Sequence, residues 1–201
     1  MRGLFAVIPL TRQPSAATLS LKGRGRYLCG SVFGWFRPYE GWHSCPMITY
    51  LAMLTEEARA YQAEAVDAYG LPPERRVSDG DGVPCRHCLQ DVAAGENYLI
   101  LAYRPFPALQ PYAETGPIFL HAKACVRADA AHETPAMLAR RAAHLIKGYS
   151  SDDRIVYGTG KIVPSADLTA EAANILKRDD VAYVHVRSSV NNCYTCRIER
   201  A

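Results

Sequence analysis

Two pairs of cysteines in this sequence have the spacing that zinc sites and thiol-redox centres use. The pairs are Cys85/Cys88 and Cys193/Cys196, and two residues separate the members of each. Four thiolates complete a tetrahedral zinc site, so together the pairs predict a structural zinc if the fold brings them to one point. A thiol-redox centre is the second interpretation, because an arginine and a histidine between the first two cysteines would stabilise a thiolate. The third is that Cys88 and Cys196 are simply small buried residues.

The position of each pair in the chain decides how well it could chelate a metal. Cys85 and Cys88 follow a proline in an expected loop, where side chains can converge. Residues three apart on a straight strand point to opposite faces, so Cys193 and Cys196 converge only if the chain turns at the preceding Asn-Asn step. The seven cysteines are odd in number and no export signal is convincing. We therefore expect mostly reduced thiols and a cytoplasmic protein.

A third group of reactive side chains alternates along the strand expected at residues 181–187. Tyr183, His185 and Arg187 share one face of it, and small apolar residues occupy the other. A hydroxyl, an imidazole and a guanidinium on one face could bind an anionic ligand or move a proton. The same alternation is typical of any half-exposed strand.

A cysteine–histidine pair is a further option for nucleophilic chemistry. It requires His121 and His185 to face one another near Cys85 or Cys193, which the sequence does not determine. The motifs of serine hydrolases, phosphate-binding loops, dinucleotide-binding folds and zinc proteases do not occur in the chain.

These residues need a scaffold, and the sequence from Met47 onward predicts strands and short helices. Strands are expected at residues 48–54, 98–103, 117–123, 144–149, 154–163, 181–187 and 194–198. Helices are expected at residues 55–69, 134–141 and 168–176, the first capped by Thr55 and the last by Asp167. Most connections are too short for parallel crossovers. The pattern favours a single α+β domain: a largely antiparallel mixed sheet with two to three helices.

Charge divides the 201 residues into two unlike parts. Residues 1–46 carry six basic residues and one acidic residue, whereas residues 47–201 carry 17 basic and 19 acidic ones. The first part has no regular period, and we expect a basic extension outside the folded unit, disordered or mis-annotated, with translation starting at Met47. The second part has no basic field for nucleic acid and no apolar run long enough to span a membrane.

Several short motifs occur in an order that resembles a known family. They are Pro84-Cys85-Arg86-His87-Cys88-Leu89, Gly95-Glu96, Pro111-Tyr112, Gly116-Pro117-Ile118-Phe119, Val181-Ala182-Tyr183-Val184-His185-Val186, Cys193-Tyr194 and Arg197. Together they are similar to the bacterial family called domain of unknown function 1203. The likeness spans about residues 48–201. That family has no assigned activity, so the resemblance implies no substrate.

Two hypotheses of function follow from these patterns. In the first, the chain is an uncharacterised soluble protein that binds a small ligand or has an accessory role, with no cofactor. Its expected site residues are Tyr183, His185, Arg187, Cys85 and Cys193. In the second, it is a zinc-stabilised or thiol-reactive protein that uses Cys85, Cys88, Cys193 and Cys196. The reaction, the ligand and the oligomeric state stay open at this point.

Overall fold

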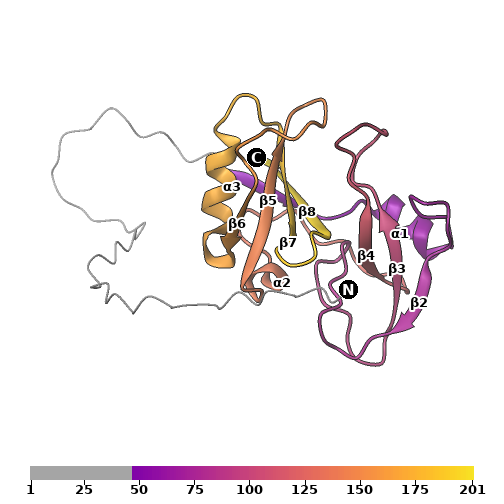
Figure 1. The fold of residues 1–201 in the computed structure, drawn as a ribbon. Coiled ribbons are helices and arrows are strands. Elements are labelled where there is room, and N and C mark those ends of the chain that lie inside the picture. Colours follow the sequence, from indigo (N-terminus) through magenta and orange to yellow (C-terminus); the bar gives the residue numbers. More distant parts are fainter. Residues whose placement is uncertain (1–46) are drawn as a thin grey trace, which may run out of the picture. The chain divides into compact units, whose positions relative to one another are not determined.

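The computed structural model describes residues 47–201, which fold around two antiparallel sheets (Figure 1). One sheet has five strands in the order β1-β8-β7-β5-β6, and the other has three in the order β2-β3-β4. The strands are β1 (Ile48–Leu51), β2 (Glu74–Val77), β3 (Asn97–Tyr103), β4 (Gly116–His121), β5 (Ala143–Tyr149), β6 (Lys161–Pro164), β7 (Tyr183–Ser188) and β8 (Tyr194–Arg200). The helices are α1 (Thr55–Gln62), α2 (Ala136–Ala139) and α3 (Leu168–Leu176). The predicted α+β class is confirmed, and the expected basic extension lies outside the described residues.

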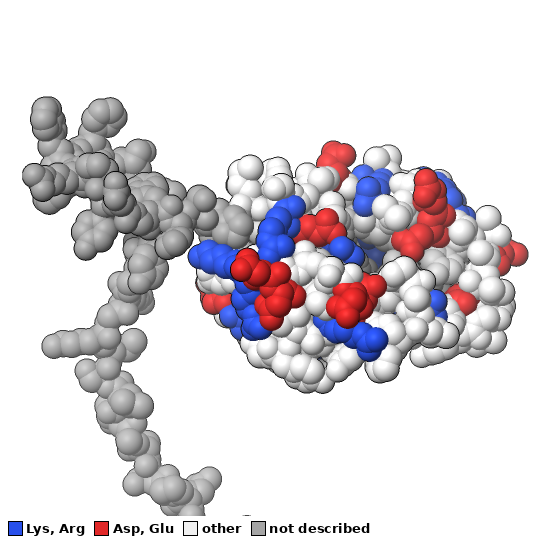
Figure 2. Space-filling view, turned by 90° about the horizontal axis from the view of Figure 1, so that it is seen from above, with Lys and Arg blue, Asp and Glu red and all other residues white. Residues whose placement is uncertain are grey.

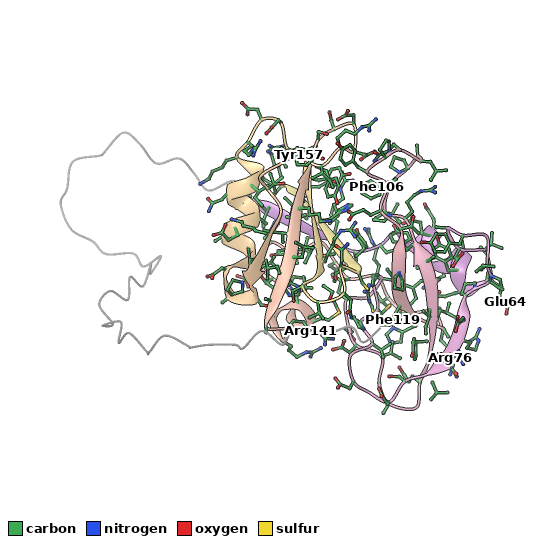
Figure 3. The ribbon with its side chains drawn as sticks, in the orientation of Figure 1. Glu64, Arg76, Phe106, Phe119, Arg141 and Tyr157 are labelled. Carbon is green, nitrogen blue, oxygen red and sulfur yellow. The ribbon has the colours of Figure 1, made fainter. Side chains whose placement is uncertain are left out.

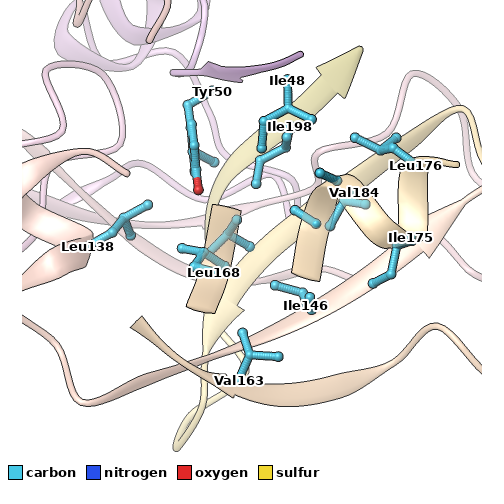
Figure 4. Close-up of a cluster of buried hydrophobic side chains, with 14 of the residues drawn as sticks. Ile48, Tyr50, Leu138, Ile146, Val163, Leu168, Ile175, Leu176, Val184 and Ile198 are labelled. Carbon is cyan, nitrogen blue, oxygen red and sulfur yellow. The ribbon is translucent and has the colours of Figure 1, made fainter. Parts of the chain in front are cut away.

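Helix α3 covers one face of the five-stranded sheet and closes the main core (Figures 1 and 4). The predicted apolar stripe of this helix is buried, with Leu168 and Leu176 at most 1% exposed. Facing it are alternate residues of the sheet, among them Ile146, Val184 and Ile198 (Figure 4). Each fully buried side chain of this kind contributes about 1.5–3 kcal/mol relative to an exposed one. Packing against α3 therefore stabilises the sheet that contains β7 and β8.

The three-stranded sheet forms a smaller lobe, which we define as residues 54–125. Its inner residues come from the centres of β3 and β4, but β2 is exposed at all four positions. Helix α1 contributes one fully buried residue, Ala58. The core that the small lobe contributes to is smaller than the main core, with 13 buried residues against 18.

Helix α1 is shorter than the sequence predicts, ending at Gln62 rather than near residue 69. Glu64 has a φ of 66°, in the left-handed region that interrupts a helix. The Asp67 carboxylate then accepts hydrogen bonds from the backbone N–H groups of Tyr69, Leu71 and Ala102. These hydrogen bonds fix a turn at residues 67–71, where the apolar spacing alone predicts that the helix continues.

Three strands also differ from prediction, and the first of them, β1, ends at Leu51 rather than at residue 54. The strand expected over residues 154–163 is reduced to β6 at its end, because Gly158 turns the chain with a φ of 83°. The hydroxyl of Thr159 accepts a hydrogen bond from the Gly148 N–H at 2.9 Å, so this segment docks on β5 through a side chain. Strand β2 was not predicted, because its four exposed and mostly charged residues show no alternation.

The surface of the described residues mixes charges of both signs. On the face shown in Figure 2, basic and acidic side chains are interspersed rather than gathered by sign. No helix within residues 47–201 is both long and apolar enough to cross a bilayer.

Candidate metal centre

Four side chains of the small lobe bring one potential metal ligand each to a common point. They are Cys85, Cys88, His121 and Cys125, whose donor atoms all lie within 4.8 Å of one another. The sulfurs of Cys85 and Cys125 are 4.0 Å apart, and the Cys88 sulfur is 3.5 Å from Nδ1 of His121. Three cysteines and one histidine are a ligand set that structural zinc sites use.

These two distances are those that a shared zinc ion requires. With Zn–S near 2.3 Å and Zn–N near 2.0–2.1 Å, tetrahedral geometry separates two sulfurs by about 3.8 Å and a sulfur from a nitrogen by about 3.6 Å. The observed separations differ from these by a few tenths of an ångström or less. A disulfide needs sulfurs about 2.05 Å apart, and all five described cysteines are free. The remaining donor pairs lie within 4.8 Å of one another, which is compatible with a metal ion bound after the side chains adjust.

A tight turn presents the first two cysteines. The N–H of Leu89 donates to the carbonyl of Cys85 at 3.0 Å, and the N–H of Cys85 donates to the carbonyl of Gln90 at 2.9 Å. Leu89 itself has a φ of 51°, which a turn this tight demands of the residue after the second cysteine. A β-bridge between Cys85 and Phe119 then fixes the turn against β4. We call residues 84–91 the knuckle.

Strand β4 and the segment after it supply the other two ligands. His121 is the last residue of β4, and its backbone N–H points to the Cys85 sulfur at 3.5 Å. Helix α1 holds the backbone of this segment: Gln62 donates to the His121 carbonyl at 2.9 Å, and Arg59 donates to the Cys125 carbonyl at 2.7 Å. The polar face of α1 therefore positions the backbone from which these two ligands project.

Polar partners behind the ligands orient them in turn. Nδ1 of His121 faces the cluster, while its Nε2 lies 3.6 Å from a carboxylate oxygen of Glu96. Nδ1 of His87 lies 3.1 Å from the Cys125 sulfur, and its Nε2 lies 3.0 Å from the Thr55 hydroxyl. The hydroxyl of Thr55, expected as a helix cap, thus contacts the ring of His87 instead. Partners of this kind stabilise thiolate and imidazole ligands at metal sites.

The three sulfurs compete for protons. Hydrogen bonds from the thiols of Cys125 and Cys88 hold the pKa of Cys85 well below its usual range. As donors in these bonds, Cys88 has a raised pKa, and the pKa of Cys125 rises to about 11. One thiolate therefore forms readily, and a metal cation would displace the protons that the other two retain.

The structure does not bring the second predicted cysteine pair to this cluster. Cys196 faces the main core under α3 with no exposed surface, and burial raises its pKa to about 12. Cys193 lines a separate cavity of about 600 Å³, together with Arg86 and Ser188. The sequence contained the other two ligands as a His-x₃-Cys spacing, which resembles the second half of many zinc motifs.

The three residues expected on an exposed or ligand-binding face of β7 are buried. Tyr183, His185 and Arg187 are 2%, 1% and 3% exposed. A loop after β3 covers them: its Phe106, labelled in Figure 3, packs on His185, and its Glu114 lies 3.1 Å from Nη2 of Arg187. The hydroxyl of Tyr183 donates to Asp153 at 2.6 Å, and Nη1 of Arg187 donates to the Asn192 carbonyl.

Of these three residues, His185 alone has no polar partner. Neither of its ring nitrogens has a hydrogen-bond partner among the described residues. His185 is also not gathered with His121, which belongs to the metal cluster of the small lobe. The Tyr183 hydroxyl is paired with Asp153; Arg187 is paired through Nη1 and lies beside Glu114, although its Nε and Nη2 have no hydrogen-bond partner among the described residues.

Comparison with known proteins places the chain in a family. A family model described as protein of unknown function (DUF1203) matches residues 82–200, more than half of the chain and a range that contains all four clustered ligands. No curated protein and no solved structure matches the chain. The chain therefore belongs to the DUF1203 family of proteins of unknown function.

Proposed function

We propose that this chain is a zinc protein, in which Cys85, Cys88, His121 and Cys125 bind one Zn²⁺. The observation that carries this proposal is the pair of donor separations, 4.0 Å between two sulfurs and 3.5 Å between sulfur and imidazole nitrogen. Softer thiolate ligands favour zinc over magnesium or calcium, which prefer oxygen. The cluster has no carboxylate ligand.

The role of the zinc is structural. Four protein ligands close the coordination shell and leave no position for a water or a substrate. The ion joins the knuckle to β4 and to the segment after it, in the lobe whose apolar core is smaller than the main core. Zinc binding contributes about 10–16 kcal/mol to the folding of small zinc domains, so the ion would add to the stability that the lobe's own core supplies.

The same chemistry supports a proposal about the cellular compartment. Zinc-binding thiolates need a reducing environment, and the five described cysteines are unpaired. We infer a cytoplasmic protein, in which oxidation does not compete with metal binding.

Metal analysis of purified variants tests the proposal. We expect about one zinc per chain in the full-length protein, and loss of most of it in Cys85→Ser and Cys125→Ser, since each removes one of four ligands. Cys193→Ser and Cys196→Ala are matched controls: they change cysteines outside the cluster and should keep the zinc.

Two outcomes would contradict it. The first is zinc lost from the control variants as readily as from the ligand variants. The second is a metal-free protein in which Cys85 reversibly forms a disulfide with Cys88 or Cys125. That result would favour the thiol-redox interpretation of the same cluster, because a catalytic dithiol needs free sulfurs.

A further inference from the structure

A cavity distinct from the metal centre lies between strand β8 and residues 51–54, at the end of β1. It has a volume of about 470 Å³, within the range of pockets that hold small molecules. Three arginines reach it from separate segments: Arg104 from the loop after β3, Arg127 from the segment after β4, and Arg197 from β8. Side chains this far apart in the sequence converge only because the fold brings them together.

Two of these three guanidinium groups have no acidic partner. Within residues 47–201, no carboxylate lies within 4.0 Å of Arg104 or Arg127. Arg127 instead donates to the carbonyls of Ala52 and Met53, at 2.7 and 3.0 Å, which fixes its position without neutralising it. Arg104 makes one long contact, 3.5 Å to a backbone carbonyl.

The two carboxylates on the cavity wall are already engaged. Glu199 forms an ion pair with Arg197, and Glu57 accepts a hydrogen bond from the hydroxyl of Tyr103 at 3.2 Å. The cavity wall has three arginines and two glutamates, so its net charge is +1. A singly charged anion complements this wall, whereas a cation would meet the two free guanidinium groups.

An unsatisfied polar group lines the same wall. His185 is 1% exposed and borders the cavity, and neither ring nitrogen has a hydrogen-bond partner in the described part of the chain. An unpaired buried polar group destabilises the folded state. Aromatic side chains enclose this ring, so it adds an uncompensated polar group behind the cavity wall rather than a direct ligand contact.

The remaining wall is apolar and aromatic. Tyr103, Tyr194 and Phe106 line the cavity, with Leu51 and Met53 beside them. Aromatic rings favour a flat or hydrocarbon body on a ligand. The wall thus offers two kinds of contact, a basic one and an apolar one.

We propose that this cavity binds a small organic monocarboxylate with an aromatic or hydrocarbon body. The carboxylate binds Arg104 and Arg127, whose planar guanidinium groups suit its two oxygens, and the body lies against Tyr103 and Tyr194. This site shares no residue with the zinc ligands, so it is a binding activity in addition to the proposed metal site.

Calorimetry on the metal-replete full-length chain tests the proposal with defined probes. Benzoate carries an aromatic ring and hexanoate a hydrocarbon chain, each with one carboxylate. Benzamide keeps the ring without the charge. Acetate and phosphate keep a charge without the ring or the chain. We expect benzoate or hexanoate to bind at least about tenfold more tightly than benzamide, acetate or phosphate, because charge and body both contribute.

Variants assign the binding to this cavity. Arg104→Gln, which loses only one long backbone contact, should weaken binding of the better probe about tenfold or more. Arg127→Gln should do the same if it keeps its fold by circular dichroism. Arg76→Gln is the matched control: it removes an exposed arginine of β2 that does not line the cavity.

Three results would overturn the proposal. One is the absence of binding by both benzoate and hexanoate at millimolar concentration. Another is equal affinity for benzoate and benzamide, or a preference for phosphate. The third is Arg104→Gln binding as tightly as Arg76→Gln. None of these depends on the metal, since zinc content is measured separately on the same samples.

Discussion

The imidazole of His185 is enclosed by four aromatic rings. The centroids of Tyr149, Tyr194, Tyr183 and Phe106 lie 4.6, 4.9, 5.0 and 5.2 Å from its own. Burial lowers its pKa well below the usual value. Arg187, Arg197 and Lys147 lower it further, since each opposes a second positive charge. The ring is therefore neutral in the folded protein at pH 7.

This environment predicts a pH dependence of stability. Below the unfolded-state pKa of about 6.5, the unfolded chain protonates His185 whereas the folded chain does not, so the free energy of unfolding falls as the pH drops. His185 alone contributes up to about 1.4 kcal/mol per pH unit below that point, until its folded-state pKa is reached. His185→Phe should remove this contribution, giving a shallower loss of stability between pH 6.5 and 5.

Urea denaturation at a series of pH values measures the effect. Acid also weakens zinc binding, but it does so in both proteins, so the difference between their slopes isolates His185. Identical slopes for the wild-type and His185→Phe proteins would show that the imidazole is protonated in the folded state.

At the residue scale, sequence reasoning found part of each site. The Cys-x-x-Cys spacing identified Cys85 and Cys88 because both belong to one local turn. Cys125 and His121 join them only through the pairing of the knuckle with β4, which no local period encodes. Alternation placed Tyr183, His185 and Arg187 on one face correctly, but not their burial. Their burial comes from the proline-rich loop after β3, whose sequence shows no regular hydrophobic alternation.

Among the elements, those with strong periodicity were predictable. Strands β5, β7 and β8 and helix α3 all pack on one core, so their apolar residues recur regularly. The parts that differed from prediction, the end of α1, the exposed β2 and the turn before β6, depend on side-chain hydrogen bonds or a positive φ. Those features leave little trace in hydrophobic patterning.

The small lobe should depend on metal more than the five-stranded sheet does. Its apolar core is smaller than the main core, and the four proposed zinc ligands join the knuckle to β4. Removing zinc with a chelator should therefore speed amide hydrogen exchange in β3, β4 and the knuckle, while β5, β7 and α3 keep most of their protection.

Hydrogen-exchange mass spectrometry checks this expectation, and adding zinc back should restore the protection. An equal loss of protection in both sheets would contradict it, as would no change in β3 and β4. Cys193→Ser provides the control: its exchange should respond to the chelator as the wild-type protein does, because Cys193 lies outside the metal cluster.

On the scale of the whole described molecule, the knuckle also connects the two sheets. Arg86, between the first two cysteine ligands, donates from Nε to the Tyr194 carbonyl of β8 at 2.7 Å. Its own carbonyl accepts the N–H of Met53, just after β1. Arg86 is 3% exposed, and the proposed zinc ion with three thiolates and a neutral imidazole would carry a net negative charge that offsets it. Metal binding at the proposed site would thus support the junction of the two sheets as well as the small lobe.

The most direct test of the zinc assignment is X-ray absorption at the zinc K-edge of the purified full-length protein. The account predicts three sulfur ligands at about 2.3 Å and one nitrogen at about 2.0–2.1 Å, the shell that Cys85, Cys88, Cys125 and His121 provide. Cys196→Ala should give the same spectrum. A shell of four sulfurs, a shell of oxygen and nitrogen alone, or a protein without zinc would contradict the account.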